Sequence, residues 1–305
     1  MRTSHGFGIA LIASALFLIV PPAAAQLDNV PPPVRRTIAA LGPTLNPDMI
    51  AKSFAAMRPL QAPRAGLVEV KDVAYGTDPL QKLDIWRRNE ARTATPIVLF
   101  VHGGGFLRGD KNDYDNVPAY FARHGFLGVN INYRLAPKAT FPGATLDLGS
   151  AVAWVRANAS RYGGDPNRIV VVGHSAGAAI VASYALDQSI DTSREGVVGA
   201  VVVSVPAGHA DIDNPYYAKN AAKDAPMAHF GEGKMPLLVT MAEYDPLALS
   251  PDSHELAAAL CHRDGMCPPF LWLSGHNHIS EVASIDTKDD RLGAAIRAFV
   301  EKVAR

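Results

Sequence analysis

The sequence predicts one α/β domain over residues 67–305, built on a mostly parallel central sheet with helices on both of its faces. Short β-branched apolar runs, long enough only for buried strands, alternate along the chain with helical segments. Helical connections of ten or more residues between strands imply parallel pairing with right-handed crossovers. The composition, 48% hydrophobic and 19% charged in 305 residues, is typical of a globular protein.

The charge of the chain excludes two classes of partner. Lysine and arginine together number 29, as do aspartate and glutamate, so the formal net charge is zero. No basic stripe runs along the sequence, whereas binding to nucleic acid or to an anionic membrane surface depends on one. We therefore expect neither nucleic acid nor a membrane surface as a partner.

Residues 1–25 have the pattern of a signal peptide. Arg2 precedes an apolar run over residues 9–20, which is too short to span a bilayer, and Ala23-Ala24-Ala25 provides a small-residue cleavage pattern. We expect the mature chain to begin near Gln26, to have no integral membrane span after cleavage, and to be exported to a periplasm or secreted. The alternatives are an uncleaved membrane anchor and a buried first helix.

Residues 26–66 are predicted to form an N-terminal arm, or partial cap, that packs on the main body. Prolines interrupt this segment repeatedly, and two short amphipathic stretches lie within it at residues 34–41 and 47–57. The segment is too short and too broken to form a domain of its own.

The remaining chain alternates between strands and helices. A hairpin is predicted at residues 68–75 and 82–86, because Gly76, Asp78 and Pro79 lie between two strand-like runs. The next expected elements are a strand at 97–101, a helix at 117–124, a strand at 127–132, a helix at 146–162, a strand at 169–172, a helix to about residue 187 and a strand at 197–205. Residues 206–234 are expected to be irregular and polar, followed by a strand at 237–241, a helix at 253–260, a strand at 270–273 and a closing helix at 291–303.

The two cysteines, Cys261 and Cys267, are six residues apart where a helix is expected to turn into a strand. In an oxidising compartment this spacing permits a short-loop disulfide, and two free buried thiols are the alternative. Without a Cys-x-x-Cys pair or a second ligand cluster, the sequence does not support a zinc site.

Ser175 stands in the pattern of a nucleophile. Gly173-His174-Ser175-Ala176-Gly177 follows the buried strand at 169–172 and precedes a helix of small residues. In this context a Gly-x-Ser-x-Gly segment makes a sharp turn that exposes the serine Oγ, and the glycines let strand and helix approach closely. The alternative is an ordinary loop serine.

A serine nucleophile also needs donors for an oxyanion, and the sequence offers two sources. The glycine run His102-Gly103-Gly104-Gly105-Phe106 directly follows the strand at 97–101, and its backbone N–H groups are unshielded. A dinucleotide loop is excluded because Arg108 stands where the third glycine belongs, whereas a plain tight turn stays open. The second source is the N–H of Ala176 at a helix start, where the helix dipole favours negative charge.

A serine also needs a base and an acid that orients the base. The acid is expected after the strand at 237–241, where Asp245 is the first choice and Glu243 the alternative. Pro246 favours an extended conformation at Asp245. The base is expected after the last strand, where His276 and His278 are both available and spacing alone does not separate them.

Four motifs in order resemble those of the α/β-hydrolase superfamily, and most of all those of the bacterial carboxylesterases related to hormone-sensitive lipase. The likeness runs from about Val73 to the C-terminus. The matching segments are Tyr133-Arg134-Leu135-Ala136-Pro137, Gly163-Gly164-Asp165-Pro166, Gly173-His174-Ser175-Ala176-Gly177 and Glu243-Tyr244-Asp245-Pro246-Leu247, with His-Gly-Gly-Gly before them.

The resemblance implies an α/β-hydrolase fold and assigns the site residues. The aspartate of the family's Asp-Pro-Leu motif completes its catalytic triad, which implies Asp245 beside Ser175. The family's histidine usually stands three residues after a glycine, which from Gly275 implies His278. The oxyanion hole of the family implies the backbone N–H groups of three residues: Gly104, Gly105 and Ala176.

The function implied is that of a serine carboxylesterase, a hydrolase of small to medium carboxylic esters that works through an acyl-enzyme. Neither a metal nor an organic cofactor is implied, and the expected partner is a small-molecule ester. Two departures bear on the substrate: the arm is shorter than the helical cap of typical members, and Ile279-Ser280 stands where Gly-Phe is frequent.

Three other functions are open at this point. Residues 75–86 and Gly109-Asp110-Lys111 resemble those of arylformamidase-like relatives, which hydrolyse a formamide with the same triad. A non-catalytic binding relative is the second, although such proteins usually lack the serine or the histidine. A lipase acting on insoluble lipid is the third, and it needs a larger apolar lid than residues 206–234 offer.

Overall fold

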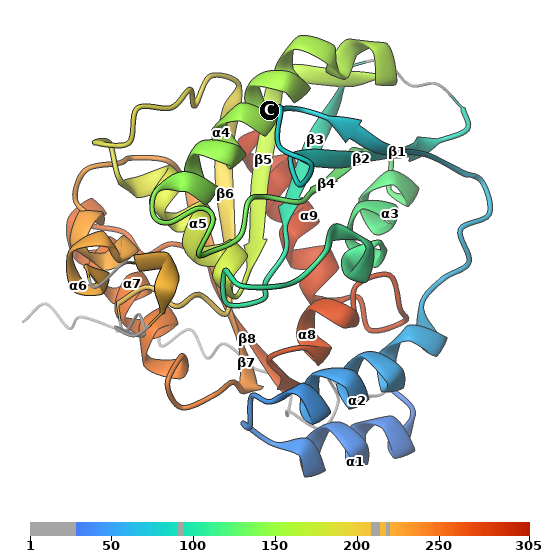
Figure 1. The fold of residues 1–305 in the computed structure, drawn as a ribbon. Coiled ribbons are helices and arrows are strands. Elements are labelled where there is room, and N and C mark those ends of the chain that lie inside the picture. The colour runs from blue at the N-terminus through green and yellow to red at the C-terminus, as the bar shows by residue number, and fades with distance from the viewer. Residues whose placement is uncertain (1–28, 91–93, 209–213, 218–219) are drawn as a thin grey trace, which may run out of the picture.

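The computed structural model describes residues 29–90, 94–208, 214–217 and 220–305. In this part of the chain an eight-stranded sheet runs through the middle of the molecule, in the order β1-β2-β4-β3-β5-β6-β7-β8 (Figure 1). Its strands are β1 (Leu67–Ala74), β2 (Lys82–Arg88), β3 (Thr95–Val101), β4 (Leu127–Ile131), β5 (Gly164–His174), β6 (Val197–Val203), β7 (Leu237–Tyr244) and β8 (Phe270–Asn277). β2 is antiparallel to both of its neighbours, and every pair from β4 to β8 is parallel. The predicted mostly parallel sheet is confirmed.

Helices cover both faces of this sheet, as predicted (Figure 1). One face packs against α4, α5 and α7, and the other against α3, α8 and α9, with α2 extending that second core. The helices are α1 (Pro32–Leu41), α2 (Pro47–Met57), α3 (Asn116–Arg123), α4 (Gly143–Asn158), α5 (Ala176–Leu186), α6 (Ala221–Asp224), α7 (Ser250–Asp264), α8 (Ser280–Ala283) and α9 (Arg291–Val303).

The physical reason for this arrangement is visible in the central strands and in the helices beside them. The last five residues of β3 and of β6 are fully buried, as a parallel strand covered on two faces requires. In α9 the buried residues recur at helical spacing, so one stripe faces the sheet and the rest faces solvent. All eleven residues of α5 are buried, and their small side chains let it lie close against β5.

The N-terminal arm forms the two helices expected from its amphipathic stretches. α2 begins at an N-cap, because the Asn46 side chain accepts a hydrogen bond of 2.8 Å from the N–H of Met49 and Pro47 occupies the first turn. The arm lies against α8 and the end of β8, at the lower edge of the molecule in Figure 1. It therefore sits beside the carboxyl ends of the parallel strands.

The segment at 206–234 differs from the expected irregular, polar stretch. Its described residues include α6 and two short 3₁₀ turns, Pro215–Tyr217 and Pro226–His229. Tyr216 and Tyr217 are buried, and the ring of Tyr216 stacks on Phe106 at 4.1 Å between centroids. These aromatic rings anchor the segment to the glycine loop, a long-range contact that local polarity does not reveal.

The signal-peptide pattern at residues 1–25 lies outside the described residues. Within the described ranges, no helix has both the length and the apolar character needed to cross a bilayer. Cys261 and Cys267 form a disulfide that closes the turn between α7 and β8.

Gly128, in the central strand β4, provides a test of the packing between α3 and the sheet. A Cβ at this position would lie 2.2 Å from the carbonyl oxygen of Pro118. Gly128→Ala is therefore expected to lower the free energy of unfolding by about 1–3 kcal/mol, the usual cost of overpacking. Urea unfolding measures this free energy. Gly231→Ala is the control, because nothing lies within 4 Å of a Cβ at position 231. Equal midpoints for the two variants would contradict the packing described.

Candidate active site

Ser175 occupies the turn between β5 and α5 with a strained backbone, at φ 57° and ψ −125°. A Cβ on Gly173 would lie 2.1 Å from the carbonyl oxygen of Gly177, and one on Gly177 would lie 2.2 Å from that of Val101. Only glycines permit this approach of helix and strand. The turn has the geometry that the Gly-x-Ser-x-Gly pattern predicts.

The strained turn is held on both sides by backbone hydrogen bonds. The N–H of Ser175 donates to the carbonyl oxygen of Val203 in β6 at 2.9 Å, and its carbonyl accepts from Ala178 at 2.8 Å. A left-handed conformation at a residue with a side chain persists only when its surroundings fix it, as they do here. The Ser175 side chain is partly exposed in a cavity.

His278 and Asp245 form a buried pair beside this serine. Nδ1 of His278 lies 2.8 Å from Oδ1 of Asp245, and both side chains are almost fully buried. Because the carboxylate accepts, Nδ1 carries the proton and Nε2 is left with a lone pair. Nε2 has no hydrogen-bond partner among the described residues, and His278 lines the same cavity as Ser175.

Asp245, rather than Glu243, faces the histidine. Its second oxygen, Oδ2, accepts from the N–H of Ala242 at 3.0 Å and from the Ser204 hydroxyl at 2.5 Å. Glu243 is exposed and accepts from the N–H of Gly275 at 2.6 Å. The position immediately after β7, and not the acidity alone, decides which carboxylate reaches the site.

His276 belongs to a different cluster. Its Nε2 lies 2.7 Å from Oδ2 of Asp289, and its Nδ1 lies 3.0 Å from the Ser280 hydroxyl. Burial alone would raise the pKa of Asp289. The pKa nevertheless lies below its ordinary value, because Arg291 and His276 form hydrogen bonds to the carboxylate. His276 is thus a buried structural residue within β8, while His278 lies just beyond the strand end.

The turn that carries His278 is fixed by its neighbours. The Asn277 side chain accepts from the N–H of Ser280 at 2.9 Å and also bonds the hydroxyl of Ser53 in the arm. His174 Nε2 donates to the carbonyl oxygen of His278 at 2.7 Å. Burial, and then the nearby His278, hold the pKa of His174 well below its ordinary value, so this ring is neutral. Its hydrogen bond restrains the turn that carries His278.

The glycine loop after β3 faces the serine. Gly104 has φ 125° and Gly105 has φ 63°, and a Cβ on Gly104 would collide with the carbonyl of Arg108. No described residue accepts a hydrogen bond from the N–H of Gly104, Gly105 or Ala176. These three residues line the cavity beside Ser175, so their N–H groups are available to an oxygen bound there.

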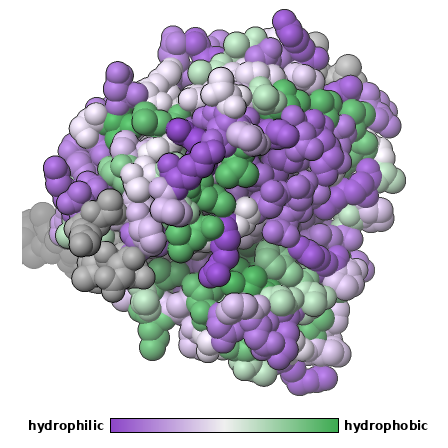
Figure 2. Space-filling model, viewed as in Figure 1, coloured by the Kyte–Doolittle hydropathy of each residue, from purple (hydrophilic) through white to green (hydrophobic). Residues whose placement is uncertain are grey.

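The cavity has a volume of about 350 Å³ and a mainly apolar lining. Leu45, Ile50 and Phe54 of the arm contribute one wall, and Tyr217 of the 206–234 segment contributes another. Figure 2 shows apolar surface along the seam between the two arm helices and the body of the molecule. The arm and the segment thus both shape the space above Ser175.

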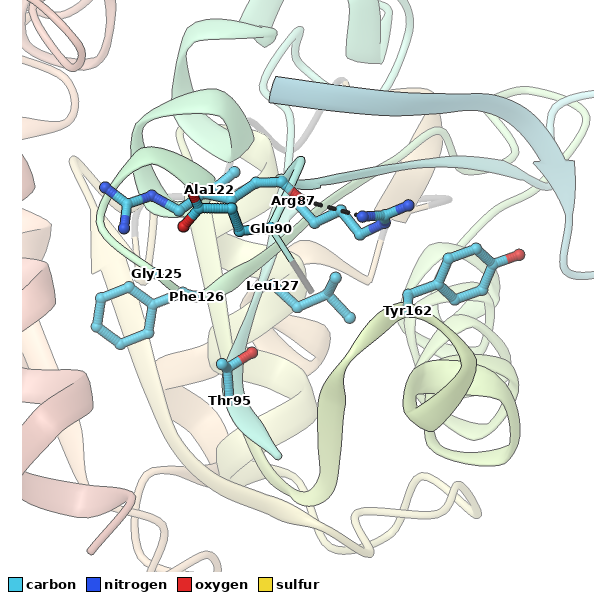
Figure 3. A pocket seen from close by; sticks show the side chains of 9 residues that line it. Arg87, Glu90, Thr95, Ala122, Gly125, Phe126, Leu127 and Tyr162 are labelled. Carbon is cyan, nitrogen blue, oxygen red and sulfur yellow. Dashed lines mark hydrogen bonds between the residues drawn. The ribbon is translucent and has the colours of Figure 1, made fainter. Parts of the chain in front are cut away.

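A second hollow, shown in Figure 3, lies at the opposite end of the sheet. Thr95 and Leu127, which line it, are the first residues of β3 and β4, whereas Ser175 follows the last residue of β5. Its volume is only about 20 Å³, room for a water rather than a substrate. Arg87, Phe126 and Tyr162 surround it.

Three groups of potential metal ligands occur among the described residues, each explained by other contacts. In the group of His174, His278 and Glu281, both histidines already bond protein partners. The second group is Asp187, His229 and Glu232, in which Glu232 and the carbonyl of Lys223 occupy both His229 nitrogens. In the third, Glu69, Asp84 and Asp115, the Lys111 ammonium lies 2.8 Å from Asp84.

Sequence reasoning missed two polar residues behind Asp245. Ser204 directly follows the buried strand β6 at the same sheet edge as Ser175 and Asp245, which is a signal that strand order offers. Glu281 lies in α8, three residues after His278, and no sequence pattern singles it out.

Comparison with known proteins finds esterases among the relatives of this chain. A family model described as BD-FAE matches residues 83–206. Esterase LipC of Mycobacterium tuberculosis is 35% identical over 184 residues, covering 53% of this chain and 45% of that one. Carboxylesterase NlhH of the same organism is 32% identical over 185 residues, covering 59% and 57%. The chain spans about half the length of the curated relatives it matches.

Solved structures show the same fold. Esterase B from Lactobacillus Rhamnosis superposes with a TM-score of 0.70 over 92% of this chain and 96% of that one, at 17% identity. A thermostable esterase from Pseudomonas putida also gives a TM-score of 0.70, over 91% and 98%, at 20% identity. The chain therefore has the α/β-hydrolase fold and is related in sequence to the bacterial carboxylesterases of the hormone-sensitive-lipase group.

Proposed function

We propose that the chain is a serine carboxylesterase that hydrolyses small to medium carboxylic esters. One observation carries this proposal: a strained, cavity-lining serine shares its cavity with a histidine whose Nε2 is unpartnered among the described residues. The other nitrogen of that histidine is bonded to a buried aspartate. This set of groups is what activates a serine hydroxyl at neutral pH.

In the proposed reaction, Ser175 Oγ attacks the ester carbonyl while His278 Nε2 takes its proton and passes it to the leaving alcohol. Asp245 orients the imidazole and stabilises it while it is charged. Water, activated by the same histidine, then hydrolyses the acyl-enzyme and releases the acid.

The oxyanion formed in each step needs donors that are in place before the reaction. The N–H groups of Gly104, Gly105 and Ala176 supply them, and the N-terminal end of α5 adds a favourable dipole. The apolar cavity favours uncharged acyl and alcohol groups over charged ones.

Ester hydrolysis is favoured over the other functions by the relatives. They include proteins named as esterases and carboxylesterases. The full set of nucleophile, base and acid argues against a non-catalytic binding role. Among the described residues, the cavity is walled by the short helix α2 and the turn Pro215–Tyr217, which favours soluble esters over insoluble lipid.

Export of the protein is part of the same proposal. The signal-peptide pattern of residues 1–25 supports it, as does the Cys261–Cys267 disulfide, because disulfides persist mainly in oxidising compartments.

Substitution of the nucleophile and of the two histidines tests the proposed roles. Ser175→Ala and His278→Ala are each expected to lower kcat on p-nitrophenyl butyrate by about 10⁴–10⁶-fold, because the triad acts as a unit. His276→Ala is the matched control: it removes a buried histidine two residues away and is expected to retain turnover, with reduced stability. Loss of turnover in His276→Ala together with its retention in His278→Ala would contradict the assignment.

The ester preference and the identity of the nucleophile need two further measurements. A fluorophosphonate is expected to add one phosphonyl mass to the peptide containing Ser175, and to leave Ser175→Ala unmodified. The kcat/KM for a short p-nitrophenyl ester is expected to exceed that for N-formylkynurenine. A larger value for the formamide would replace the esterase proposal by amide hydrolysis.

The arm wall is testable through chain-length preference. Ile50→Ala shortens a half-buried side chain that lines the cavity, so kcat/KM for p-nitrophenyl hexanoate and octanoate is expected to rise relative to the acetate. Room for one or two further methylene groups corresponds to a rise of about 10-fold in this kcat/KM ratio. Lys52→Ala, on the exposed side of the same helix, is the control. An unchanged ratio in Ile50→Ala would show that the arm does not contact the acyl group.

A further inference from the structure

Behind the His278–Asp245 pair lies a second acidic side chain that the proposed mechanism does not use. Glu281 is completely buried, and its Oε1 is hydrogen-bonded to the hydroxyl of Ser204. The same hydroxyl lies 2.5 Å from Oδ2 of Asp245. One hydroxyl therefore bridges two buried carboxyl groups, one of which holds the proposed catalytic base.

The number of available protons fixes the direction of the two hydrogen bonds at the Ser204 hydroxyl. A hydroxyl has one proton and can donate to only one of the two carboxyl groups, so the other must donate to the hydroxyl. Asp245 accepts three bonds, from His278 Nδ1, the Ala242 N–H and Ser204, and is fully satisfied as an anion. Oε2 of Glu281 has no partner among the described residues, which an ionised buried carboxylate would not tolerate.

The charges around Glu281 agree with this count. The titratable groups that face it are Asp245 after β7, His174 at the end of β5 and His278 after β8. Burial, and then the negative charge of Asp245, raise the pKa of Glu281 well above its ordinary value. His174, 3.7 Å away, is neutral for the reason given above and supplies no compensating charge.

We propose that Glu281 is a positioning residue of the triad, which as a neutral acid donates through the Ser204 hydroxyl to Asp245 and fixes the carboxylate that orients His278. The Ser204 backbone has φ 50°, a left-handed conformation that such a fixed role accounts for. The proposal rests on the esterase function only for its kinetic readout. Its structural content, a protonated Glu281 beside an ionised Asp245, holds for any reaction at this site.

Two substitutions at position 281 separate hydrogen bonding from charge. Glu281→Gln keeps the shape and keeps a donor for Ser204, so kcat is expected to stay within about threefold of the wild-type value. Glu281→Leu fills a similar volume without a donor, so kcat is expected to fall by about 10–100-fold, with KM changed by less than about twofold. Rescue by the conservative variant, and a change in kcat rather than KM, distinguish positioning from a general loss of structure.

The pH profile tests which form of Glu281 is present. With a neutral Glu281, the midpoint of the acidic limb of kcat/KM is the same in Glu281→Gln and wild type. With an ionised Glu281, removing the charge would shift that midpoint to lower pH by about one unit or more, since the charge lies close to His278 in a buried site. Such a shift, or an unchanged kcat in Glu281→Leu, would overturn the proposal.

An NMR titration of His278 keeps the test independent of folding yield and of activity. The imidazole ¹³Cε1 resonance is followed against pH in wild type and Glu281→Gln, and the proposal expects coincident titration midpoints. Separate midpoints would overturn it, even if Glu281→Leu fails to fold. If wild-type protein hydrolyses no ester, the esterase proposal fails, while the comparison of midpoints still decides the state of Glu281.

Discussion

The hydrogen bond between Asp245 Oδ1 and His278 Nδ1 joins the loops that follow two neighbouring parallel strands, β7 and β8. Because parallel strands end at the same edge of a sheet, residues 33 apart in sequence meet there. The bond places the proton on Nδ1 and leaves Nε2, which has no partner among the described residues, with a lone pair. Hydrogen bonds restrain this pair on each side. His174 bonds the carbonyl of His278, Asn277 bonds Ser53 of the arm, and the Ser204 hydroxyl bonds Asp245.

Much of the fold could be predicted because its core strands are short Val- and Ile-rich runs separated by helical segments. The ends of β7 and β8 could not. Both strands continue past their apolar runs, to Tyr244 and Asn277, because ladder pairing with a neighbour, not hydrophobicity, sets where a strand stops. The buried tyrosines of the 206–234 segment were also missed, since their partner, Phe106, lies far away in sequence.

The site shows the same division between local and long-range information. The elbow around Ser175 is a local pattern, and its strained geometry follows from the two glycines. The choice between His276 and His278 depends on where β8 ends, so spacing left it open and the family resemblance, not the residues, indicated His278. Glu281 has no local signal at all, because its role arises only when three strands and α8 bring their polar groups together.

The structure of the protein after reaction with a fluorophosphonate tests the central claim most directly, since the adduct imitates the tetrahedral intermediate. The account predicts phosphorus bonded to Ser175 Oγ and the phosphoryl oxygen about 2.7–3.1 Å from the N–H groups of the glycine loop and Ala176. It also predicts His278 Nε2 within hydrogen-bonding distance of an oxygen on that phosphorus. A phosphoryl oxygen turned away from these N–H groups, or an imidazole separated from both the adduct and Asp245, would contradict it.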